Sequence, residues 1–424
     1  MKQVIVAGCG AAGMMAAIMA ARAGAAVTVL EGMDRPGKKL LLTGNGRCNL
    51  TNLEPDLPDR YHGFGDTQTA AAAAQVIRKF SAKDTLAVFH SLGLFTMEKN
   101  GYVYPGTAQA SSVLDLLLAE MKRRKVKQKL SEKVVGITKG NGRWTVRTEN
   151  WNYECDSLIL CCGSRAAAAT GSDGSGYELA RQAGHQVTSI LPGLTALYCQ
   201  NSRFFGSCAG VRVQAAAALY RKDGRNGRVF LASDEGELQI TENGLSGIVI
   251  FQISRYASIG LERGEMIEAE LDFAPYQSED GLYQFMDEIQ TSCLETDIGS
   301  AQALAGLLPK KLLLSFLEKY KIKPGTPIAG IAKEKLRVLS HEIKHFCVPV
   351  TGIRSFDQCQ VCVGGVPMSE IDPDTMESRL AGGLYFAGEM VDVDGPCGGY
   401  NLQWAWSSGA LAGRSAAAEQ KFLL

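Results

Sequence analysis

The run Gln3-Val4-Ile5-Val6-Ala7-Gly8-Cys9-Gly10-Ala11-Ala12-Gly13 decides how this chain begins to fold. A short apolar strand leads directly into the pattern Gly-x-Gly-x-x-Gly, and a helical run follows from 14 to 23. Gly8 allows the tight turn, Gly10 lets a pyrophosphate approach the backbone, and Gly13 lets the helix pack closely on the strand. The N–H groups at the start of that helix then face the phosphates. The stretch predicts a dinucleotide-binding βαβ unit.

An acidic residue ends the second predicted strand. Residues 26–30, Ala-Val-Thr-Val-Leu, are followed by Glu31, which lies 18 residues after Gly13. A carboxylate at this spacing binds the 2′-hydroxyl of an adenosine ribose. Gly32 and Met33 come next and offer no arginine for a 2′-phosphate. The residues therefore predict FAD or NAD, bound through an unphosphorylated ribose.

The segment after this strand favours FAD over NAD. A simple NAD dehydrogenase would continue with alternating strands and helices, whereas residues 34–52, DRPGKKLLLTGNGRCNLTN, follow neither period. Lys38, Lys39 and Arg47 place positive charge beside the predicted dinucleotide, and residues 43–46 are rich in turn formers. We expect this loop to wrap an extended FAD molecule.

The composition is that of a globular protein with more than one domain. The chain has 424 residues, which exceeds what one hydrophobic core usually serves. Its 44 Lys and Arg balance 44 Asp and Glu, which argues against a nucleic-acid binder that depends on a basic excess. Twelve cysteines without a visible secretion signal predict free thiols in a cytoplasmic protein. The weakly polar run 11–30 is broken by Arg22 and Gly24, so no membrane span is expected.

The middle of the chain changes character near residue 191. Before that point the pattern predicts two helices, over 70–92 and 111–125. It then predicts three strands, over 134–137, 144–148 and 153–161. After residue 191, short strands are followed by helices, with no second Gly-x-Gly-x-x-Gly to hold a resident nicotinamide nucleotide. We interpret residues 191–339 as an inserted β-rich and helical domain that covers the cofactor and shapes a substrate pocket.

The end of the chain returns to the nucleotide-binding pattern. The strand 384–387 is followed by Gly388 and Glu389, and a glycine-rich turn ending at Asn401 precedes a helix over 402–412. A helix N-terminus beside a flavin ring stabilises the negative charge of the reduced ring. We predict an α/β fold, in which a Rossmann-like FAD-binding domain of the glutathione-reductase type is built from residues 1–190 and 340–424.

His341-Glu342-Ile343-Lys344-His345 matches the zinc-protease motif His-Glu-x-x-His. The motif needs both histidines on one helix face and a third ligand nearby. Residues 346–350 are instead strand-like, and no histidine follows downstream. We therefore reject the protease interpretation and expect no metal site.

Two further patterns have structural explanations. Cys359 and Cys362 form a Cys-x-x-Cys pair, but positions i and i+3 of a strand point to opposite faces, so two separate buried thiols are expected. The basic run 122–125 ends a helix, where cations complement the helix dipole, and nucleic-acid binding is the weaker interpretation.

Taken together, the motifs resemble those of the BaiN/YhiN-like bacterial NAD(P)/FAD-dependent flavoproteins, a family also labelled aminoacetone-oxidase-like. The resemblance covers essentially the whole chain. The matching segments are GCGAAG at 8–13, KKLLLTGNGRCNLTN at 38–52, GSDGSGYELARQAGH at 171–185, GGVPMSEIDPDTMESRLAGGLYFAGEMVDVDG at 364–395 and GGYNLQWAWSSGALAG at 398–413.

The resemblance implies which residues contact FAD. Ala12, Glu31, Lys39, Val134, Glu389 and Leu402 fall at its contact positions, with Val134 beside the adenine and Glu389 beside the ribityl chain and ring. Together with the motif positions, the cofactor-binding candidates are Gly8, Gly10, Ala12, Gly13, Glu31, Lys38, Lys39, Gly46, Val134, Gly388, Glu389, Asn401 and Leu402.

The chain departs from the family pattern at three places. Cys161-Cys162-Gly163-Ser164 replaces the usual Ala-Thr-Gly-Gly after a strand. Ile240-Thr241-Glu242 replaces Phe-Thr-His, and Ile248 replaces a proline. The missing histidine removes a titratable group from the inserted domain, so no catalytic role based on it is expected here.

The activity implied by the resemblance is reduction of conjugated C=C bonds in 3-oxo bile acids, a small hydrophobic substrate class. NADH or NADPH would visit transiently to reduce the flavin. Tyr400, Cys397 and Tyr104 are the candidate proton donors, on position and chemistry only. Two alternatives remain, namely a flavin oxidase of small amines and an RNA-modifying flavoprotein.

Overall fold

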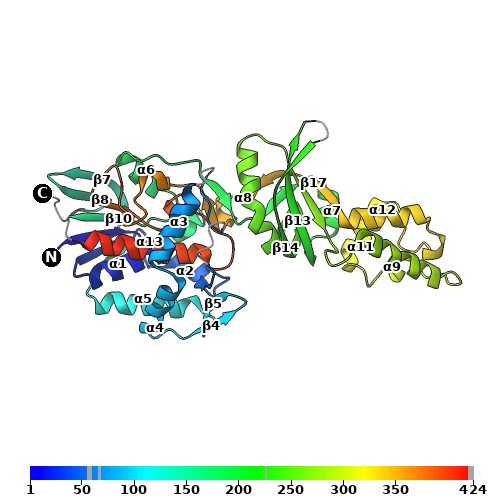
Figure 1. Cartoon of the computed structure of the whole chain (residues 1–424), viewed down its shortest axis with the longest axis horizontal. Coiled ribbons are helices and arrows are strands. Elements are labelled where there is room, and N and C mark those ends of the chain that lie inside the picture. Colours follow the sequence, from blue (N-terminus) through cyan, green and yellow to red (C-terminus); the bar gives the residue numbers. More distant parts are fainter. Residues whose placement is uncertain (55–59, 65–67, 225–226, 419–424) are drawn as a thin grey trace. The chain divides into compact units, whose positions relative to one another are not determined.

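The structure is a computed structural model that describes residues 1–54, 60–64, 68–224 and 227–418 (Figure 1). The chain divides into unit 1, Met1–Pro192 with Phe356–Leu424, and unit 2, Gly193–Ser355. The first boundary falls close to the predicted residue 190. The second falls after residue 355 rather than after 339, because strand β17 (Phe346–Ile353) belongs to the barrel of unit 2.

A five-stranded sheet forms the centre of unit 1, with the order β19-β10-β1-β2-β6. Each neighbouring pair is parallel. The strands are β1 (Gln3–Ala7), β2 (Ala26–Leu30), β6 (Lys127–Lys129), β10 (Ser157–Leu160) and β19 (Leu384–Phe386). β10 and β19 are buried along their whole length, as expected of parallel strands covered on both faces. The prediction of a Rossmann-like α/β fold is confirmed.

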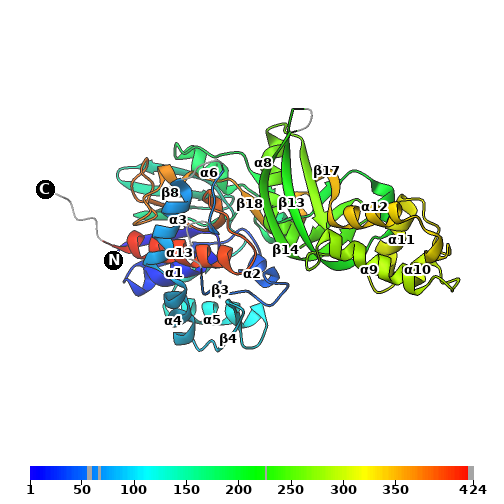
Figure 2. The same ribbon diagram turned by 45° about the vertical axis from the view of Figure 1, so that its right-hand side comes forward.

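The first and last helices of the chain pack against each other on this sheet (Figures 1 and 2). They are α1 (Ala11–Arg22) and α13 (Tyr400–Ala417), and both contact β1 and β10. A Cβ atom added at Gly409 would lie 2.5 Å from the Ala12 carbonyl oxygen, and one at Gly413 would lie 2.3 Å from that of Ala16. The two helix backbones therefore touch, which only glycine permits.

Smaller elements complete unit 1. Its other helices are α2 (Lys38–Leu42), α3 (Gln68–Lys79), α4 (Ala82–Ser91), α5 (Ala110–Arg123) and α6 (Gly176–Gln182), with the 3-10 turns η2 (Ala168–Thr170), η4 (Phe356–Gln358), η5 (Met368–Glu370) and η6 (Gly388–Met390). Its small sheets have the orders β3-β5-β4, β7-β8-β9 and β11-β18. Their strands are β3 (Thr51–Asn52), β4 (Thr96–Lys99), β5 (Tyr102–Pro105), β7 (Val134–Gly140), β8 (Arg143–Thr148), β9 (Asn152–Cys155), β11 (Leu191–Gly193) and β18 (Val361–Val363).

The helix predicted over 70–92 is two helices, α3 and α4. Ser81 lies between them and caps α4 through a reciprocal pair of hydrogen bonds. Its hydroxyl accepts from the Asp84 N–H (3.3 Å), while the Asp84 carboxylate accepts from the Ser81 N–H (2.8 Å). The capping box ends one helix and starts the next, although the apolar period continues across it.

The strand predicted over 153–161 is also divided. Its first part, β9, belongs to the antiparallel sheet, and its second part, β10, belongs to the parallel sheet. Asp156 lies between them, and its carboxylate accepts a hydrogen bond from the Gln3 N–H (2.7 Å). This bond ties the point where the chain changes sheets to the start of β1.

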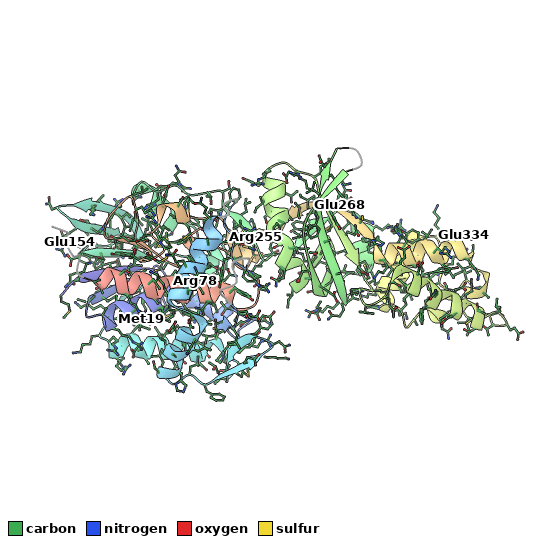
Figure 3. All side chains as sticks on the ribbon, viewed as in Figure 1. Met19, Arg78, Glu154, Arg255, Glu268 and Glu334 are labelled. Atoms are coloured by element: carbon green, nitrogen blue, oxygen red, sulfur yellow. The ribbon has the colours of Figure 1, made fainter. Side chains whose placement is uncertain are left out.

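Unit 2 contains a closed barrel with the strand order β12-β15-β14-β13-β16-β17. Its other strands are β12 (Leu197–Cys199), β13 (Arg212–Asp223), β14 (Gly227–Thr241), β15 (Gly244–Gly247) and β16 (Ile267–Asp272). Along β13, Ala215, Ala217 and Leu219 alternate with less buried residues and face the core. α8 (Ile248–Glu262) packs on this barrel. Figure 3 labels Arg255, which lies on α8, and Glu268, which lies on β16.

The remaining helices of unit 2 lie together at one end of the barrel, where β16 ends and β17 begins (Figure 2). They are α7 (Ser202–Ser207), α9 (Glu279–Ser292), α10 (Ser300–Ala303), α11 (Lys310–Lys319) and α12 (Lys333–Lys344), with the 3-10 turn η3 (Ile328–Gly330). Phenylalanine rings join them to the barrel. Phe204 of α7 stacks on Phe346 of β17 with ring centroids 4.6 Å apart, and Phe316 of α11 lies 5.7 Å from the same ring.

Half of the cations in the basic run 122–125 pair with one buried carboxylate. Glu120 is 3% exposed and bonds Arg22 of α1 (2.9 Å), Arg123 (2.5 Å) and Arg124 (3.1 Å). Burial alone would raise the pKa of Glu120, but the hydrogen bonds from the three arginines outweigh it and hold that pKa below its usual range. Two of the four cations of this run therefore serve an internal ion-pair cluster that joins α5 to α1.

We expect Glu120→Gln to lower the free energy of unfolding at neutral pH by about 1–3 kcal/mol, because three arginines lose a desolvated carboxylate partner. Since the pKa of Glu120 is lower in the folded protein, its contribution is present above the unfolded pKa and is lost as the pH falls through the folded pKa. Denaturant unfolding curves of the variant and the wild type should therefore converge in acid. Glu178→Gln, which removes an exposed acid 3.6 Å from Arg181, should change little at any pH.

The contact between the helix backbones yields a second prediction. Gly413→Ala should destabilise the protein by about 1–3 kcal/mol, because the added methyl group forces α13 away from the backbone of α1. Gly206→Ala is the matched control, since its Cβ would meet nothing within 4 Å. Thermal unfolding should show a lower midpoint for the first variant alone. Equal midpoints for the two variants would mean that the close approach of α1 and α13 contributes nothing to the free energy of unfolding.

Candidate cofactor site

The polar residues singled out from the sequence gather at one edge of the parallel sheet. The Gly8–Gly13 turn follows β1, Glu31 follows β2, Ser164 lies a few residues after β10, and Glu389 follows β19. The carboxyl ends of parallel strands meet at the same edge, and β1 has β2 on one side and β10 on the other. Open α/β sheets bind their ligands at this kind of position, beside the carboxyl ends of strands whose connections run to opposite sides.

The turn after β1 has the shape of a phosphate cradle. A Cβ at Gly8, whose φ is +100°, would lie 2.4 Å from the Cys161 carbonyl oxygen, and one at Gly13 would lie 2.0 Å from that of Gly8. A Cβ at Gly10 would meet nothing within 4 Å. Protein packing thus demands glycine at the first and third positions, whereas the space beside Gly10 is open. No side chain caps α1 and its first turn holds no acid, so its N-terminus suits an anion.

Glu31 is fixed at the rim of this cradle. One of its carboxylate oxygens accepts from the Cys9 N–H (2.7 Å) and the other accepts from the Met33 N–H (2.8 Å). The backbone N–H of Glu132 donates to the Glu31 carbonyl oxygen (2.8 Å), which places the start of β7 and its first residue, Val134, beside the same loop. The structure therefore brings both predicted adenosine contacts together.

Glu132 is a residue of this region that the sequence did not single out. It is 9% exposed, and among the described residues no hydrogen-bond partner reaches its Oε2 atom, while Asn150 donates to Oε1 at 3.4 Å. A buried carboxylate oxygen without a donor is costly, and a donor group on a bound ligand would satisfy it. No sequence motif distinguishes Glu132 from the other glutamates, because its position beside the Glu31 loop arises only in the folded chain.

Lys39 of α2, Glu389 of η6 and Ser164 form a second cluster. The Lys39 ammonium pairs with the Glu389 carboxylate, and the Ser164 hydroxyl donates to the same carboxylate oxygen at 3.1 Å. Lys38, the other predicted lysine, pairs instead with the exposed Asp34 at 2.6 Å. Adjacent residues of a helix point in different directions, so only one of the two lysines joins this cluster.

The loop between α2 and β3 is held by left-handed backbone conformations. Gly44, Asn45, Gly46 and Cys48 all have φ between +57° and +81°. The Gly46 carbonyl oxygen accepts from the N–H of Ala110, the first residue of α5. The turn-rich sequence is thus explained by the loop's own geometry, which Gly46 supports through its positive φ.

The start of α13 lies against the paired strands β3 and β5. A Cβ at Gly399, whose φ is +92°, would lie 2.5 Å from the Thr51 backbone, and one at Gly398 would lie 2.3 Å from the Tyr102 ring. No side chain caps α13. The Asn401 amide bonds both backbone groups of Gly395, donating at 2.8 Å and accepting at 2.9 Å. Asn401 therefore shapes the preceding turn.

Leu402 and Gln403 follow at the start of the same helix. Leu402 is partly buried against the main core of unit 1. Gln403 is fully buried, accepts from the Thr51 hydroxyl (2.6 Å) and donates to the Phe80 carbonyl oxygen (3.2 Å). Gln403 thus ties α13 to β3 and to the end of α3, a role that its helical position in the sequence did not reveal.

The three candidate proton donors differ in their surroundings. Tyr104 of β5 is partly exposed, and the Arg47 guanidinium lies 5.8 Å from its ring centroid. Burial raises the pKa of Tyr104 despite that cation, so the phenol keeps its proton at neutral pH. The Tyr400 ring is buried, with its centroid 6.0 Å from that of Tyr61, and Cys397 is partly exposed in the turn before α13.

The prediction that Cys359 and Cys362 point apart was wrong. β18 begins only at Val361, so Cys359 lies in the turn before the strand, where its thiol donates to the Phe356 carbonyl oxygen at 3.3 Å. The two buried thiols interact, which lowers the pKa of Cys362 and raises that of Cys359. Both are free thiols. The alternation rule failed because it was applied beyond the end of the strand.

Comparison with known proteins identifies the family. The profile described as "HI0933-like protein Rossmann domain" matches residues 2–415. The chain belongs to this HI0933-like family. A relative of this HI0933-like protein, the 3-dehydro-bile acid delta(4,6)-reductase of Clostridium scindens, is 41% identical over 419 residues, 98% of this chain and 99% of that one. The ribosomal RNA dihydrouridine synthase of Escherichia coli is 29% identical over 407 residues, 95% of each chain. The family membership predicted from the motifs is confirmed.

A solved structure shares the fold of the HI0933-like protein. It is the 3-ketosteroid-delta4-(5alpha)-dehydrogenase from Rhodococcus jostii RHA1 in complex with 4-androstene-3,17-dione. It aligns with a TM-score of 0.50 at 17% identity, covering 99% of this chain and 97% of that one. Within the part of the chain that the structure describes, no helix is both long and apolar enough to cross a membrane.

The residues of the site fit FAD. The uncapped N-terminus of α1 and the open space at Gly10 suit a pyrophosphate. Glu31 follows β2, the position from which a ribose hydroxyl would be bound, and Glu132 Oε2, which has no partner among the described residues, would accept a ligand donor beside it. The uncapped N-terminus of α13 suits the electron-rich edge of a flavin ring.

The adjacent lysines offer a matched test of this site. Lys39→Met should weaken FAD binding about tenfold or more, because Glu389 loses its cation and a charge-assisted contact of about 1.5–3 kcal/mol disappears. Lys38→Met should leave FAD binding unchanged, since Lys38 pairs with Asp34 at the surface. The measurement is the FAD content of the purified variants and their flavin dissociation constants. An equal loss in both would mean that general positive charge, rather than the Lys39–Glu389 pair, holds the cofactor.

Proposed function

We propose that this protein is an FAD-dependent oxidoreductase that reduces conjugated C=C bonds of 3-oxo (3-dehydro) bile acids, with NADH as the electron donor. The observation that carries the proposal is the 41% identity, over almost the whole of both chains, to a 3-dehydro-bile acid delta(4,6)-reductase. The cradle after β1 and the Lys39–Glu389–Ser164 cluster support the cofactor part of it.

When bound, FAD supplies hydride transfer from NADH to the electron-poor carbon of the conjugated ketone. The chain's own residues hold that chemistry in place. Lys39 and Ser164 fix the Glu389 carboxylate at the carboxyl end of β19. The N-terminus of α13 directs its positive dipole end at negative charge developing in front of it. Each reduced C=C bond consumes one NADH and one proton and releases NAD⁺.

The proton for the second carbon requires a donor, and Tyr104 is our candidate. Its phenol keeps its proton at neutral pH, and Arg47 beside the ring stabilises the phenolate that remains after donation. Tyr104 also lies on the same face of β5 as Tyr102, which abuts Gly398 at the start of α13. Tyr400 is the weaker candidate because its ring is buried.

The relative named as a ribosomal RNA dihydrouridine synthase favours a second candidate function, reduction of a uridine in RNA. Its identity to this chain is lower, at 29%. The charge pattern also speaks against a large nucleic-acid partner. The net charge is zero, and Arg123 and Arg124 of the basic run are bonded to Glu120 rather than free for phosphates.

An anaerobic absorption titration tests the proposal. NADH is added to the purified holoprotein until the flavin bleaches, and a 3-oxo-4,6-dienoic bile acid follows. We expect the yellow colour to return in proportion to the steroid added. Bleaching without recovery would rule out the bile-acid substrate, and recovery with a uridine-containing ribosomal RNA fragment would favour the second function. Peroxide formation from a small amine, without NADH, would overturn both.

The same experiment tests the proton donor. Tyr104→Phe should slow the return of colour by about a hundredfold or more, because the second carbon loses its acid. Bleaching by NADH should keep its rate, since that step needs no such proton. Tyr102→Phe, on the same face of the strand, is the control and should leave both steps unchanged. If the two variants behave alike, the proton comes from another group.

A further inference from the structure

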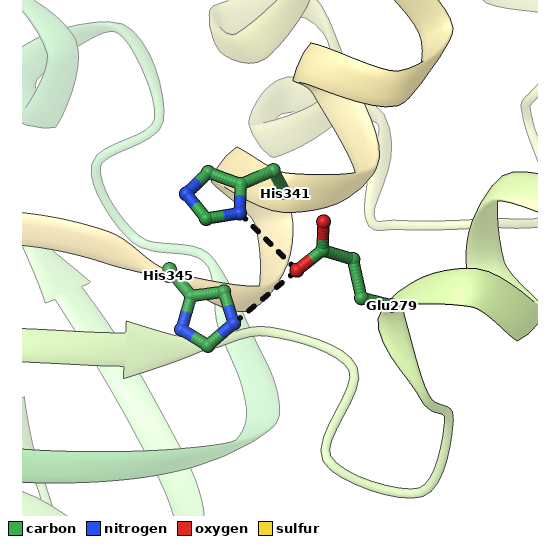
Figure 4. Close-up of side chains that lie close together, drawn as sticks. All are labelled: Glu279, His341 and His345. Atoms are coloured by element: carbon green, nitrogen blue, oxygen red, sulfur yellow. Dashed lines mark hydrogen bonds and ion pairs between the residues drawn. The ribbon is translucent and has the colours of Figure 1, made fainter.

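Two histidines and a glutamate lie together at the surface of unit 2 (Figure 4). Glu279 is the first residue of α9, His341 lies in the last turn of α12, and His345 follows that helix directly. Glu279 Oε2 is 3.1 Å from His341 Nδ1 and 3.5 Å from His345 Nε2. Figure 4 shows both imidazole rings turned toward this one carboxylate.

We propose that Glu279, His341 and His345 form a binding site for a divalent transition metal ion, with zinc as the best match. Imidazole nitrogen and carboxylate oxygen are established zinc ligands, at bond lengths of about 2.0–2.2 Å. A tetrahedral site with such bonds has ligand atoms about 3.3–3.5 Å apart. The ligand atoms here all lie within 4.8 Å of one another, and the distances from Glu279 Oε2 to the two imidazole nitrogens are already close to that spacing. Only small side-chain rotations are needed, and water would fill the fourth position.

A further carboxylate orients one of the histidines. Glu270 Oε1 lies 3.0 Å from His345 Nδ1, so the Nδ1–H donates to Glu270 and leaves Nε2 as the atom that faces Glu279. This carboxylate–histidine–metal arrangement fixes the tautomer and orientation of a metal-binding histidine. Glu270 itself pairs with Arg228. Burial alone would raise the pKa of Glu270, but its bonds to His345 and Arg228 outweigh it and keep the carboxylate ionised.

The arrangement differs from that of a zinc protease. The glutamate of the His-Glu-x-x-His motif, Glu342, accepts from the Lys319 ammonium at 3.0 Å and bonds the Tyr320 hydroxyl, so it is not poised as a general base. The third ligand is Glu279, which lies on a helix more than 60 residues upstream, whereas the motif leads one to expect a ligand downstream. The expectation that this motif carries no metal site is therefore revised, while the rejection of a protease is kept.

A metal ion at this position would join three elements within unit 2. It would tie the start of α9 to the end of α12 and to the entrance of the barrel strand β17. A cation there also complements the negative end of the α12 dipole. The inferred role is structural, because it holds the helical part of the unit to its barrel.

Isothermal titration of the chelator-treated holoprotein with zinc chloride tests the site. We expect one zinc ion per chain at this site, with binding lost in the double variant His341→Ala/His345→Ala. Glu270→Gln should weaken zinc binding by about 10–100-fold, as loss of an orienting partner does. Both histidines are exposed, so the variants should fold, and an unchanged circular dichroism spectrum checks this. His90→Ala removes an exposed histidine from the last turn of α4 and should bind zinc as the wild type does.

The cysteines require a separate control, because thiolates bind zinc strongly. Cys347 is exposed and lies 3.8 Å from Glu270, so Cys347→Ser should keep the zinc if the site is correct. X-ray absorption of the zinc-loaded protein should show nitrogen and oxygen neighbours and no sulfur at about 2.3 Å. Sulfur neighbours, zinc lost with Cys347, or full binding by the double histidine variant would each overturn the proposal.

Discussion

The backbone of α1 touches the backbone of α13, and the rest of unit 1 depends on that contact. Gly409 and Gly413 let two helices that are separated by almost the whole chain approach until carbonyl oxygens meet bare Cα atoms. The N-terminus of α1 is set by the turn after β1, the body of α13 is set by its contact with α1, and the start of α13 rests against Thr51 and Tyr102. Two uncapped helix ends, one suited to phosphates and one to a flavin ring, are thereby held in a fixed relation.

An ion pair and a hydrogen bond join further segments of unit 1. Lys39, Ser164 and Glu389 come from three distant segments and meet at the carboxyl edge of the sheet. Ser164 follows β10 and supplies a hydroxyl to this cluster. Its hydrogen bond to Glu389 adds a neutral donor to the lysine cation. The two bonds together hold a carboxylate that stands beside the proposed cofactor.

The sequence predicted well where one short stretch carries the whole signal. The glycine turn, the acid after β2 and the parallel strands needed only local spacing and periodicity. Prediction failed where a local rule was extended too far. The helix expected over 70–92 is interrupted by the Ser81–Asp84 capping box, and the strand expected over 153–161 changes sheets at Asp156. In both cases the apolar pattern continues across a break that hydrogen bonds create.

By itself the sequence determined the glycine turn after β1, the α/β fold class and the family, because backbone conformation and burial period are encoded by neighbouring residues. The tertiary structure alone decided which side chains meet. It placed Lys39 and not Lys38 against Glu389, brought Cys359 to Cys362, and joined His341 and His345 to Glu279. Such partners lie on different elements, and the packing of those elements fixes their distance, which no local pattern records.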